Sequence, residues 1–405
     1  MPGVSIRLST CLILLAIAGV VCADEWSATP SVQVRMQHDD NINLSIDSPV
    51  SVWGTSVSPL LDLRKRTALS MYGIGARLTF NRYSEDSVRD TNSQLLTFAG
   101  RSNTRLDRFG LAGSYRRDTT FATIAGGRDV EGEDATGGDE EDDTDAGVVR
   151  TEVRRHRLSL NPSWTRALTR VTSTRVGYSL NDTKYSDDAG TSLVDFRRHG
   201  INAALLHNID QRDEINVSVA FSKYRAPDRE VETDDYNISA GVAHEFSPLL
   251  RGELALGISS VTTTFGNDED KSSGSSFNAS LVKKQSEQTM YRLFLERDLY
   301  PSGVGTLVLS DRLRINYSHD VSPTLSLSLW ANAFRNRSLD FFSAAADRVY
   351  YNLEPAFRWN LARLWSVDGS YRYRWQKYDD QDDAAESGAV FLAVNYAWPR
   401  MAVSR

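Results

Sequence analysis

Along nearly the whole chain, apolar and polar side chains alternate with a period of two residues. In residues 214–224 the apolar members are Ile215, Val217, Val219 and Phe221, and small or polar residues separate them. The same pattern recurs in residues 72–80, 251–259, 351–361 and 390–398. Successive side chains of a strand point to opposite faces, so this alternation predicts strands with one apolar face. The chain is therefore expected to be all-β.

The breaks between these segments alternate along the chain between short ones and long ones. The short breaks are residues 64–66, 103–104, 167–169, 210–212, 247–248, 286–287, 322–323 and 362–363. The long polar breaks are residues 39–48, 84–91, 120–149, 185–192, 226–233, 266–273, 298–305, 338–346 and 379–387. Nine long and eight short breaks predict eighteen antiparallel strands, with sixteen as the alternative count.

Such a pattern favours a transmembrane up-and-down β-barrel over a soluble sandwich or propeller. The segments are about ten to fourteen residues long, which exceeds the usual globular strand and is enough to cross a bilayer. Short turns on one side and long loops on the other are typical of outer-membrane barrels. The mean hydropathy of −0.39 does not argue against this, because only alternate residues of each strand face lipid.

The first residues have the features of a cleaved export signal. Arg7 precedes an uncharged apolar run from Cys11 to Val21, and small residues lead to a predicted cleavage after Ala23. Residues 1–23 are thus expected to be removed, and residues 24–405 to form a single barrel domain in the outer membrane. Both cysteines lie in the removed segment, so a disulfide, a thiolate metal site and a thiol nucleophile are excluded.

The beginning of the mature chain carries a recognisable pattern. Trp26 is followed by Pro30-Ser31, and then by Asp39-Asp40-Asn41-Ile42-Asn43-Leu44. This opening resembles that of outer-membrane β-barrels associated with the PEP-CTERM/exosortase system, and it is similar also to the β-barrel porin type 2 group. The resemblance implies an outer-membrane location and a part in exopolysaccharide or surface-protein export. It brings no catalytic residue with it.

Arginines gather on the face of the last strands that should line the lumen. They are Arg312, Arg314, Arg358, Arg372 and Arg374. Such a cluster would favour anions or line a path for an acidic polysaccharide. Glu296 and Glu354 share this face, so the alternative is an ordinary charged interior that is held together by ion pairs and closed to flux.

The long break at residues 120–149 is strongly acidic. Its carboxylates include Glu131, Glu133, Asp134, Asp139, Glu140, Glu141, Asp142 and Asp143. A block of like charges cannot bury a core, so a solvated loop is expected. The functional alternative is loose binding of divalent cations beside lipopolysaccharide, since carboxylate oxygens suit hard cations. The block lacks the spacing of a true calcium loop, and no specific metal site or cofactor is expected.

The net charge and the positions of the histidines limit which other functions are expected. The net charge of −7 argues against nucleic-acid binding. The six histidines are scattered without metal-ligand spacing, so no enzyme activity is expected, and a hydrolase is the outlying alternative. Tyr396 and Trp398 close the last alternating segment and suit recognition by the barrel-assembly machinery. The leading hypothesis is a porin-like conduit or accessory barrel, and the second is a non-conducting barrel for structure or surface display.

Overall fold

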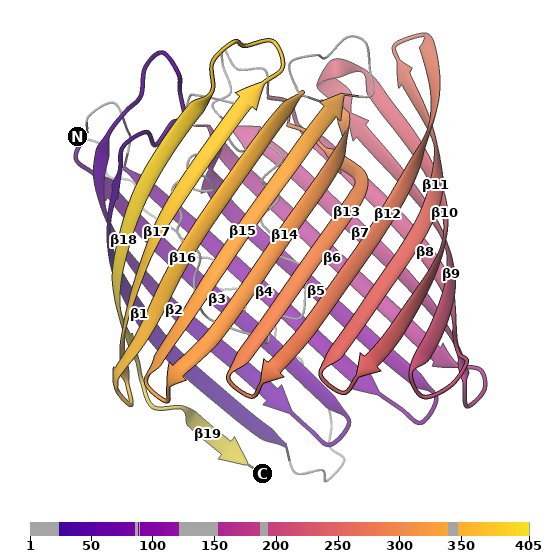
Figure 1. Ribbon diagram of the computed structural model, residues 1–405, viewed down its shortest axis with the longest axis horizontal. Coiled ribbons are helices and arrows are strands. Elements are labelled where there is room, and N and C mark those ends of the chain that lie inside the picture. Colours follow the sequence, from indigo (N-terminus) through magenta and orange to yellow (C-terminus); the bar gives the residue numbers. More distant parts are fainter. Residues whose placement is uncertain are drawn as a thin grey trace, which may run out of the picture.

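The computed structural model describes residues 24–85, 88, 90–120, 153–186, 193–303, 305–338 and 347–404. Nineteen strands in this part of the chain form one sheet, which closes on itself (Figure 1). The first ten are β1 Glu25–Asp39, β2 Val52–Arg66, β3 Ser70–Tyr83, β4 Thr91–Asn103, β5 Asp107–Thr119, β6 Arg154–Ala167, β7 Thr172–Ser186, β8 Phe196–Asn208, β9 Asp213–Ala226 and β10 Val231–Ser247. The others are β11 Leu250–Phe265, β12 Asp268–Ser286, β13 Thr289–Pro301, β14 Leu307–Ser322, β15 Leu325–Ser338, β16 Arg348–Ala362, β17 Trp365–Tyr378, β18 Ala385–Ala397 and β19 Met401–Ser404.

The barrel closes between its first and last long strands. β1 pairs with β2 along its whole length and, on its other edge, with β18 from Ser31↔Ala397 to Asp39↔Ala389. All pairings are antiparallel between neighbours, so β1 to β18 form an up-and-down barrel of eighteen strands. This confirms the expected fold and the strand count of eighteen, and the alternative count of sixteen is wrong. Closure leaves no open sheet edge toward lipid, which the hydrocarbon core could not satisfy.

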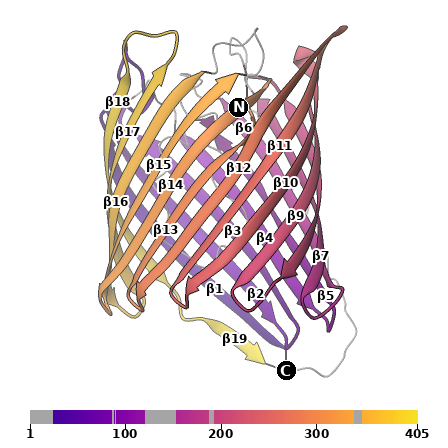
Figure 2. The same ribbon diagram turned by 45° about the vertical axis from the view of Figure 1, so that its right-hand side comes forward.

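The residues after β18 continue the wall of the barrel. Pro399 lacks a backbone N–H and interrupts the strand, while Trp398 N still donates to Pro30 O at 3.0 Å. β19 then pairs with the start of β1, from Ala28↔Met401 to Glu25↔Ser404. Figure 2 shows β19 at the end of the barrel that carries the short turns.

The apolar set of each strand lies on the outside. Ile258 is 70% exposed and Trp359 50% exposed, although both are large and apolar. Their neighbours of opposite parity face the interior, as the alternation predicts. An apolar exterior around a polar interior is the arrangement of an outer-membrane barrel, in which lipid covers the outer face.

Most predicted breaks overlap connections between strands, but two are wrong. The predicted short break at residues 64–66 is the end of β2, and the turn that follows is residues 67–69. The expected long loop at residues 266–273 is also wrong. β11 and β12 are joined by the two residues Gly266 and Asn267, and the strands of this hairpin pair from Phe265↔Asp268 onward. β12 pairs with β13 only from Ser286 to Phe277, so residues 268–276 extend beyond that neighbour. The extension is polar on both faces, and alternation therefore gave no signal for it.

Within the described residues, no helix is long and apolar enough to cross a membrane. The predicted export signal, residues 1–23, lies outside the described residues.

Candidate functional site in the barrel lumen

The five arginines predicted to line the lumen do lie on the inner face, on β14, β16 and β17. Four of them form ion pairs across the inner wall: Arg314 with Glu296 at 3.3 Å, Arg358 with Asp368 at 2.8 Å, Arg372 with Glu354 at 2.9 Å and Arg374 with Asp39 at 2.8 Å. Arg312 lies over the ring of Tyr300, with 3.5 Å between its guanidinium carbon and the ring centroid. The inward position of Glu296 and Glu354 is thus as predicted.

These arginines do not form one continuous charged surface. The side chains of Arg372 and Arg374 are only 5% and 1% exposed, whereas those of Arg314 and Arg358 are 16% and 19% exposed. Residue parity gives the face of the sheet on which a side chain lies, but not what covers it. Arg372 and Arg374 therefore stabilise the wall, and only the others present partly accessible charge to the lumen.

The segment that covers Arg374 is the connection between β1 and β2, residues 40–51. It folds back into the barrel and is held by Asn41, whose side chain is buried. The Asn41 amide oxygen accepts a hydrogen bond from Ser45 N at 3.0 Å. Its amide nitrogen donates to Ser45 O at 2.9 Å and to Glu386 O at 2.8 Å. One asparagine thus fixes the turn of this connection and attaches it to β18.

Apolar residues seat the same connection against the inner wall. Leu44 packs with Phe334, Tyr350 and Ala385, and Ile42 packs in a separate cluster on the β2 side. Leu44 is 2% exposed and has a φ of 47°, a left-handed conformation that costs a leucine energy. The Asp-Asn-Ile-x-Leu residues seen in the sequence are therefore the residues that dock this connection inside the barrel.

A second segment enters the lumen from the other side. Gly303 O, in the connection after β13, accepts a hydrogen bond from Val194 N at 2.8 Å. Leu299 O, near the end of β13, accepts one from Arg198 at 2.8 Å. Arg198 lies on the inner face of β8, which is separated from β13 by four strands of the wall. The segment must therefore cross inside the barrel to reach it. Both segments reduce the space at the end of the lumen that carries the long connections.

The inner face of β3 to β7 is strongly basic, a feature that the sequence analysis missed. Outward apolar neighbours such as Tyr72, Phe109 and Tyr178 place the residues of opposite parity in the lumen. This set contains Arg77, Arg101, Arg108, Arg116 and Arg175, referred to here as the basic wall. Arg101, Arg108 and Arg175 form no ion pair with any residue that the structure describes.

On the inner face of the described part of β3 to β7, one acidic residue accompanies the basic wall. Asp118 is buried, and it accepts hydrogen bonds from Arg155 at 3.2 Å and Arg157 at 2.9 Å. Its charge is thus matched by those two arginines. The basic wall was identifiable in principle from arginines at inward parity on consecutive strands, with glycine, serine and threonine between them.

The acidic loop and the histidines are the remaining sequence candidates for metal or catalytic chemistry. The acidic loop from Glu131 to Asp143 lies outside them, so the structure does not address a cation site there. Elsewhere in the described chain, no group of three or more His, Cys, Asp or Glu residues is placed to hold a metal. His319 contacts the hydroxyl of Thr289 at 2.8 Å, a contact between adjacent strands.

A family model described as Putative beta-barrel porin 2 matches residues 23–397. The chain belongs to this porin family. The membership confirms the similarity to the β-barrel porin type 2 group, and with the closed apolar-faced barrel it places the protein in the outer membrane. The protein is thus a porin-like outer-membrane barrel.

Comparison with solved structures gives similar barrels at low identity. OpdL of Pseudomonas aeruginosa is 11% identical with a TM-score of 0.46, over 92% of this chain and 98% of that chain. OpdK of the same organism is 10% identical with a TM-score of 0.45, over 92% and 99%. A BenF-like porin from Pseudomonas fluorescens Pf-5 has the same identity, TM-score and coverage as OpdK. None of the curated proteins matches the sequence.

Proposed function

We propose that this porin is a diffusion conduit for small anions across the outer membrane. The basic wall on β3 to β7 is the observation that carries the proposal. Barrels of sixteen to eighteen strands are wide enough for an aqueous channel. The guanidinium groups of Arg101, Arg108 and Arg175, which form no ion pair with the described residues, raise the local concentration of anions in a confined lumen and repel cations.

The proposal is tested by the reversal potential of the purified barrel in a planar bilayer under a potassium chloride gradient. We expect anion selectivity, which falls severalfold when Arg101, Arg108 and Arg175 are all replaced by serine. The effect should be largest at low salt, because the Debye length shortens to about 8 Å at physiological ionic strength.

Arg166 provides a matched control for this experiment. Arg166 lies opposite Thr174 of β7, the residue before Arg175, so it is at nearly the same height in the barrel wall as Arg175. Its side chain, however, lies on the outer face of β6. Arg166→Ser removes one positive charge at the height of Arg175 and should leave selectivity unchanged, whereas Arg175→Ser alone should lower it. A cation-selective wild-type channel, or equal effects of the inner and outer substitutions, would contradict the proposal.

The two inward segments favour a second candidate, a non-conducting barrel with a structural or surface-display role. Connection 40–51 is fixed by buried hydrogen bonds and apolar contacts, which is what a permanent closure of the lumen needs. The same bilayer measurement separates the candidates. Absence of conductance from a correctly folded, heat-modifiable barrel would favour the closed barrel and contradict the conduit proposal.

A link to exopolysaccharide or surface-protein export is a further part of the proposal. Its support is the resemblance of the mature N-terminus, Trp26 to Leu44, to barrels of the PEP-CTERM/exosortase system. An acidic polysaccharide would also suit a basic lumen. Loss of surface polysaccharide in cells that lack the barrel, restored by the wild-type protein, would support the link, and normal surface material would contradict it.

We propose lipopolysaccharide and the barrel-assembly machinery as partners. Arg297 and Arg337 flank Asp311 on the outer face, beyond the apolar band of β13 to β15, where lipid phosphates are expected. Tyr396 and Trp398 are in contact near the end of the last long strand, with 4.7 Å between ring centroids, and lie where assembly factors would meet the unpaired strand.

A further inference from the structure

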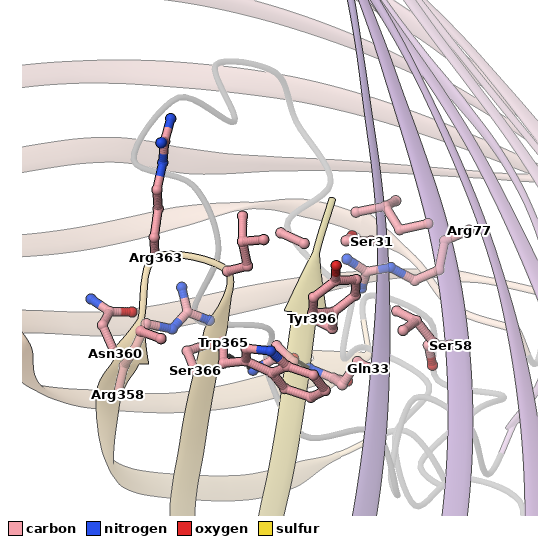
Figure 3. A pocket seen from close by; sticks show the side chains of 16 residues that line it. Ser31, Gln33, Ser58, Arg77, Arg358, Asn360, Arg363, Trp365, Ser366 and Tyr396 are labelled. Carbon is pink, nitrogen blue, oxygen red and sulfur yellow. Dashed lines mark hydrogen bonds between the residues drawn. The ribbon is translucent and has the colours of Figure 1, made fainter. Parts of the chain in front are cut away.

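A cavity of about 190 Å³ lies where the first and last strands of the barrel meet. Ser31, Gln33, Ser58, Arg77, Arg358 and Asn360 are among the residues that line it (Figure 3). They come from β1, β2, β3 and β16, and their parity places them on the inner face. The turn between β16 and β17 borders the cavity, so it belongs to the periplasmic half of the lumen. The lining contains three arginines, Arg77, Arg358 and Arg363, and no carboxylate.

A hydrogen-bonded network holds one side of the cavity in place. Gln33 donates to Asn395 at 2.9 Å, and Asn395 donates to Asp368 at 2.8 Å. Asp368 is buried behind this layer and accepts two hydrogen bonds from Arg358, at 2.8 and 2.9 Å. The network links β1, β18, β17 and β16, so the polar groups of the cavity are positioned before any solute arrives.

Groups of two kinds face each other across the cavity. Figure 3 shows Arg77 reaching from β3 toward Ser31 and Tyr396, while Arg358 and Asn360 lie together on the opposite side. The side chain of Asn360 is exposed and has no hydrogen-bond partner among the described residues. A solute in the cavity would thus meet a guanidinium on one side and a carboxamide on the other.

We propose that this cavity is a binding site for a small carboxylate that also carries hydroxyl groups. A planar guanidinium such as that of Arg77 matches a carboxylate. The amide of Asn360 and the hydroxyls of Ser31 and Ser58 both donate and accept hydrogen bonds, as a polyhydroxylated solute requires. The volume is smaller than the roughly 300–1,000 Å³ of sites for drug-sized ligands, so the solute is small.

The proposal rests on the conduit function, because the cavity would be a binding site on the path that the solute follows through the barrel. Gluconate is a suitable test solute, with glucose as its uncharged counterpart and acetate as a carboxylate without hydroxyls. We expect gluconate to reduce the chloride current of the purified barrel in a saturable manner, at concentrations where glucose and acetate do not.

Two substitutions locate the effect. Arg77→Gln should raise the half-blocking gluconate concentration by roughly tenfold or more, the loss expected for a charge-assisted hydrogen bond. Asn360→Ala should raise it by a smaller factor, and its exposed, unpartnered side chain makes a folding defect unexpected. Arg101→Gln, in the basic wall but not among the residues lining the cavity, should lower anion selectivity and leave the half-blocking concentration unchanged.

Titration calorimetry of the detergent-solubilised barrel with gluconate keeps the site testable even if no current is seen. If gluconate binds with a heat that Arg77→Gln and Asn360→Ala reduce, the binding site is supported. The absence of current would then contradict only the conduit function. A conducting channel with non-saturating inhibition, equal inhibition by glucose, or no response to either substitution would overturn the site while leaving the conduit intact.

Discussion

Arg374 on β17 donates a 2.8 Å hydrogen bond to Asp39 at the end of β1, although 335 positions separate the two residues. The two side chains are each 1% exposed. Arg374 also donates to the backbone oxygen of Asn41 at 3.2 Å. One guanidinium therefore connects the last part of the barrel wall to the first connection and holds that connection in the lumen.

Removal of Arg374 should destabilise the barrel. Arg374→Ala leaves the Asp39 carboxylate buried without its partner, which costs about 3–5 kcal/mol when one member of a buried pair is lost. Urea-induced unfolding in lipid vesicles measures the change. Arg335→Ala is the control, because Arg335 and Asp379 are 3.8 Å apart and both about half exposed. That exposed pair should contribute no more than about 1 kcal/mol, and equal losses for the two variants would contradict the assignment.

Leu44→Asp should release connection 40–51 from the inner wall. A carboxylate cannot replace a leucine packed on Phe334 and Tyr350 without a large desolvation cost, so the connection should leave its seat. We expect a higher single-channel conductance, or the appearance of conductance if the wild-type barrel is closed. Ser48→Asp adds the same charge at an exposed position of the same connection and should change little. Unchanged conductance in Leu44→Asp would show that the connection does not limit flux.

Gly305 and Gly266 allow a comparison of the second inward segment with a hairpin turn. Both have positive φ, 92° and 59°, so alanine at either position pays a backbone cost of about 1 kcal/mol. A methyl group on Gly305 would also lie 2.8 Å from Val194 Cγ2 and 2.9 Å from Arg229 Cγ. On Gly266 the nearest atom is Glu230 Oε2 at 3.6 Å.

Gly305→Ala should accordingly lower the unfolding free energy more than Gly266→Ala. It should also increase conductance, because the segment after β13 is displaced from Val194, which precedes β8. Urea unfolding and single-channel recording measure the two effects. If Gly266→Ala lowers the unfolding free energy more than Gly305→Ala does, the segment after β13 is not packed as tightly against Val194 as the distances imply.

Truncation of the C-terminus separates barrel closure from the β19 extension. Removal of residues 399–405 deletes β19 but keeps the pairing of β1 with β18 from Ser31 to Asp39. This variant should assemble and remain heat-modifiable, and Tyr396 and Trp398 would then suffice as the assembly signal. Removal of residues 389–405 deletes the closing pairs and should abolish assembly. Failure of the shorter truncation would assign β19 an essential part in closure or recognition.

The wall of the barrel was predictable because strand geometry is local. A side-chain period of two residues fixes which residues share a face, and Ile258 and Trp359 lie on the lipid face as their alternation requires. The inward position of Arg314 and Arg358 follows in the same way. Alternation gave no signal for residues 268–276, where both faces of the strand are polar.

The sequence by itself determined an up-and-down barrel, its lipid-facing set and its lumen-facing set, while the count of eighteen over sixteen was decided by the closed sheet. Only the tertiary structure decided which lumen-facing charges are accessible. Arg374 and Arg101 have the same inward parity, yet Arg374 is enclosed by connection 40–51, and Arg101 forms no ion pair with the described residues. The difference comes from contacts between segments hundreds of residues apart. Barrel closure brings them together, and no local pattern encodes their distance.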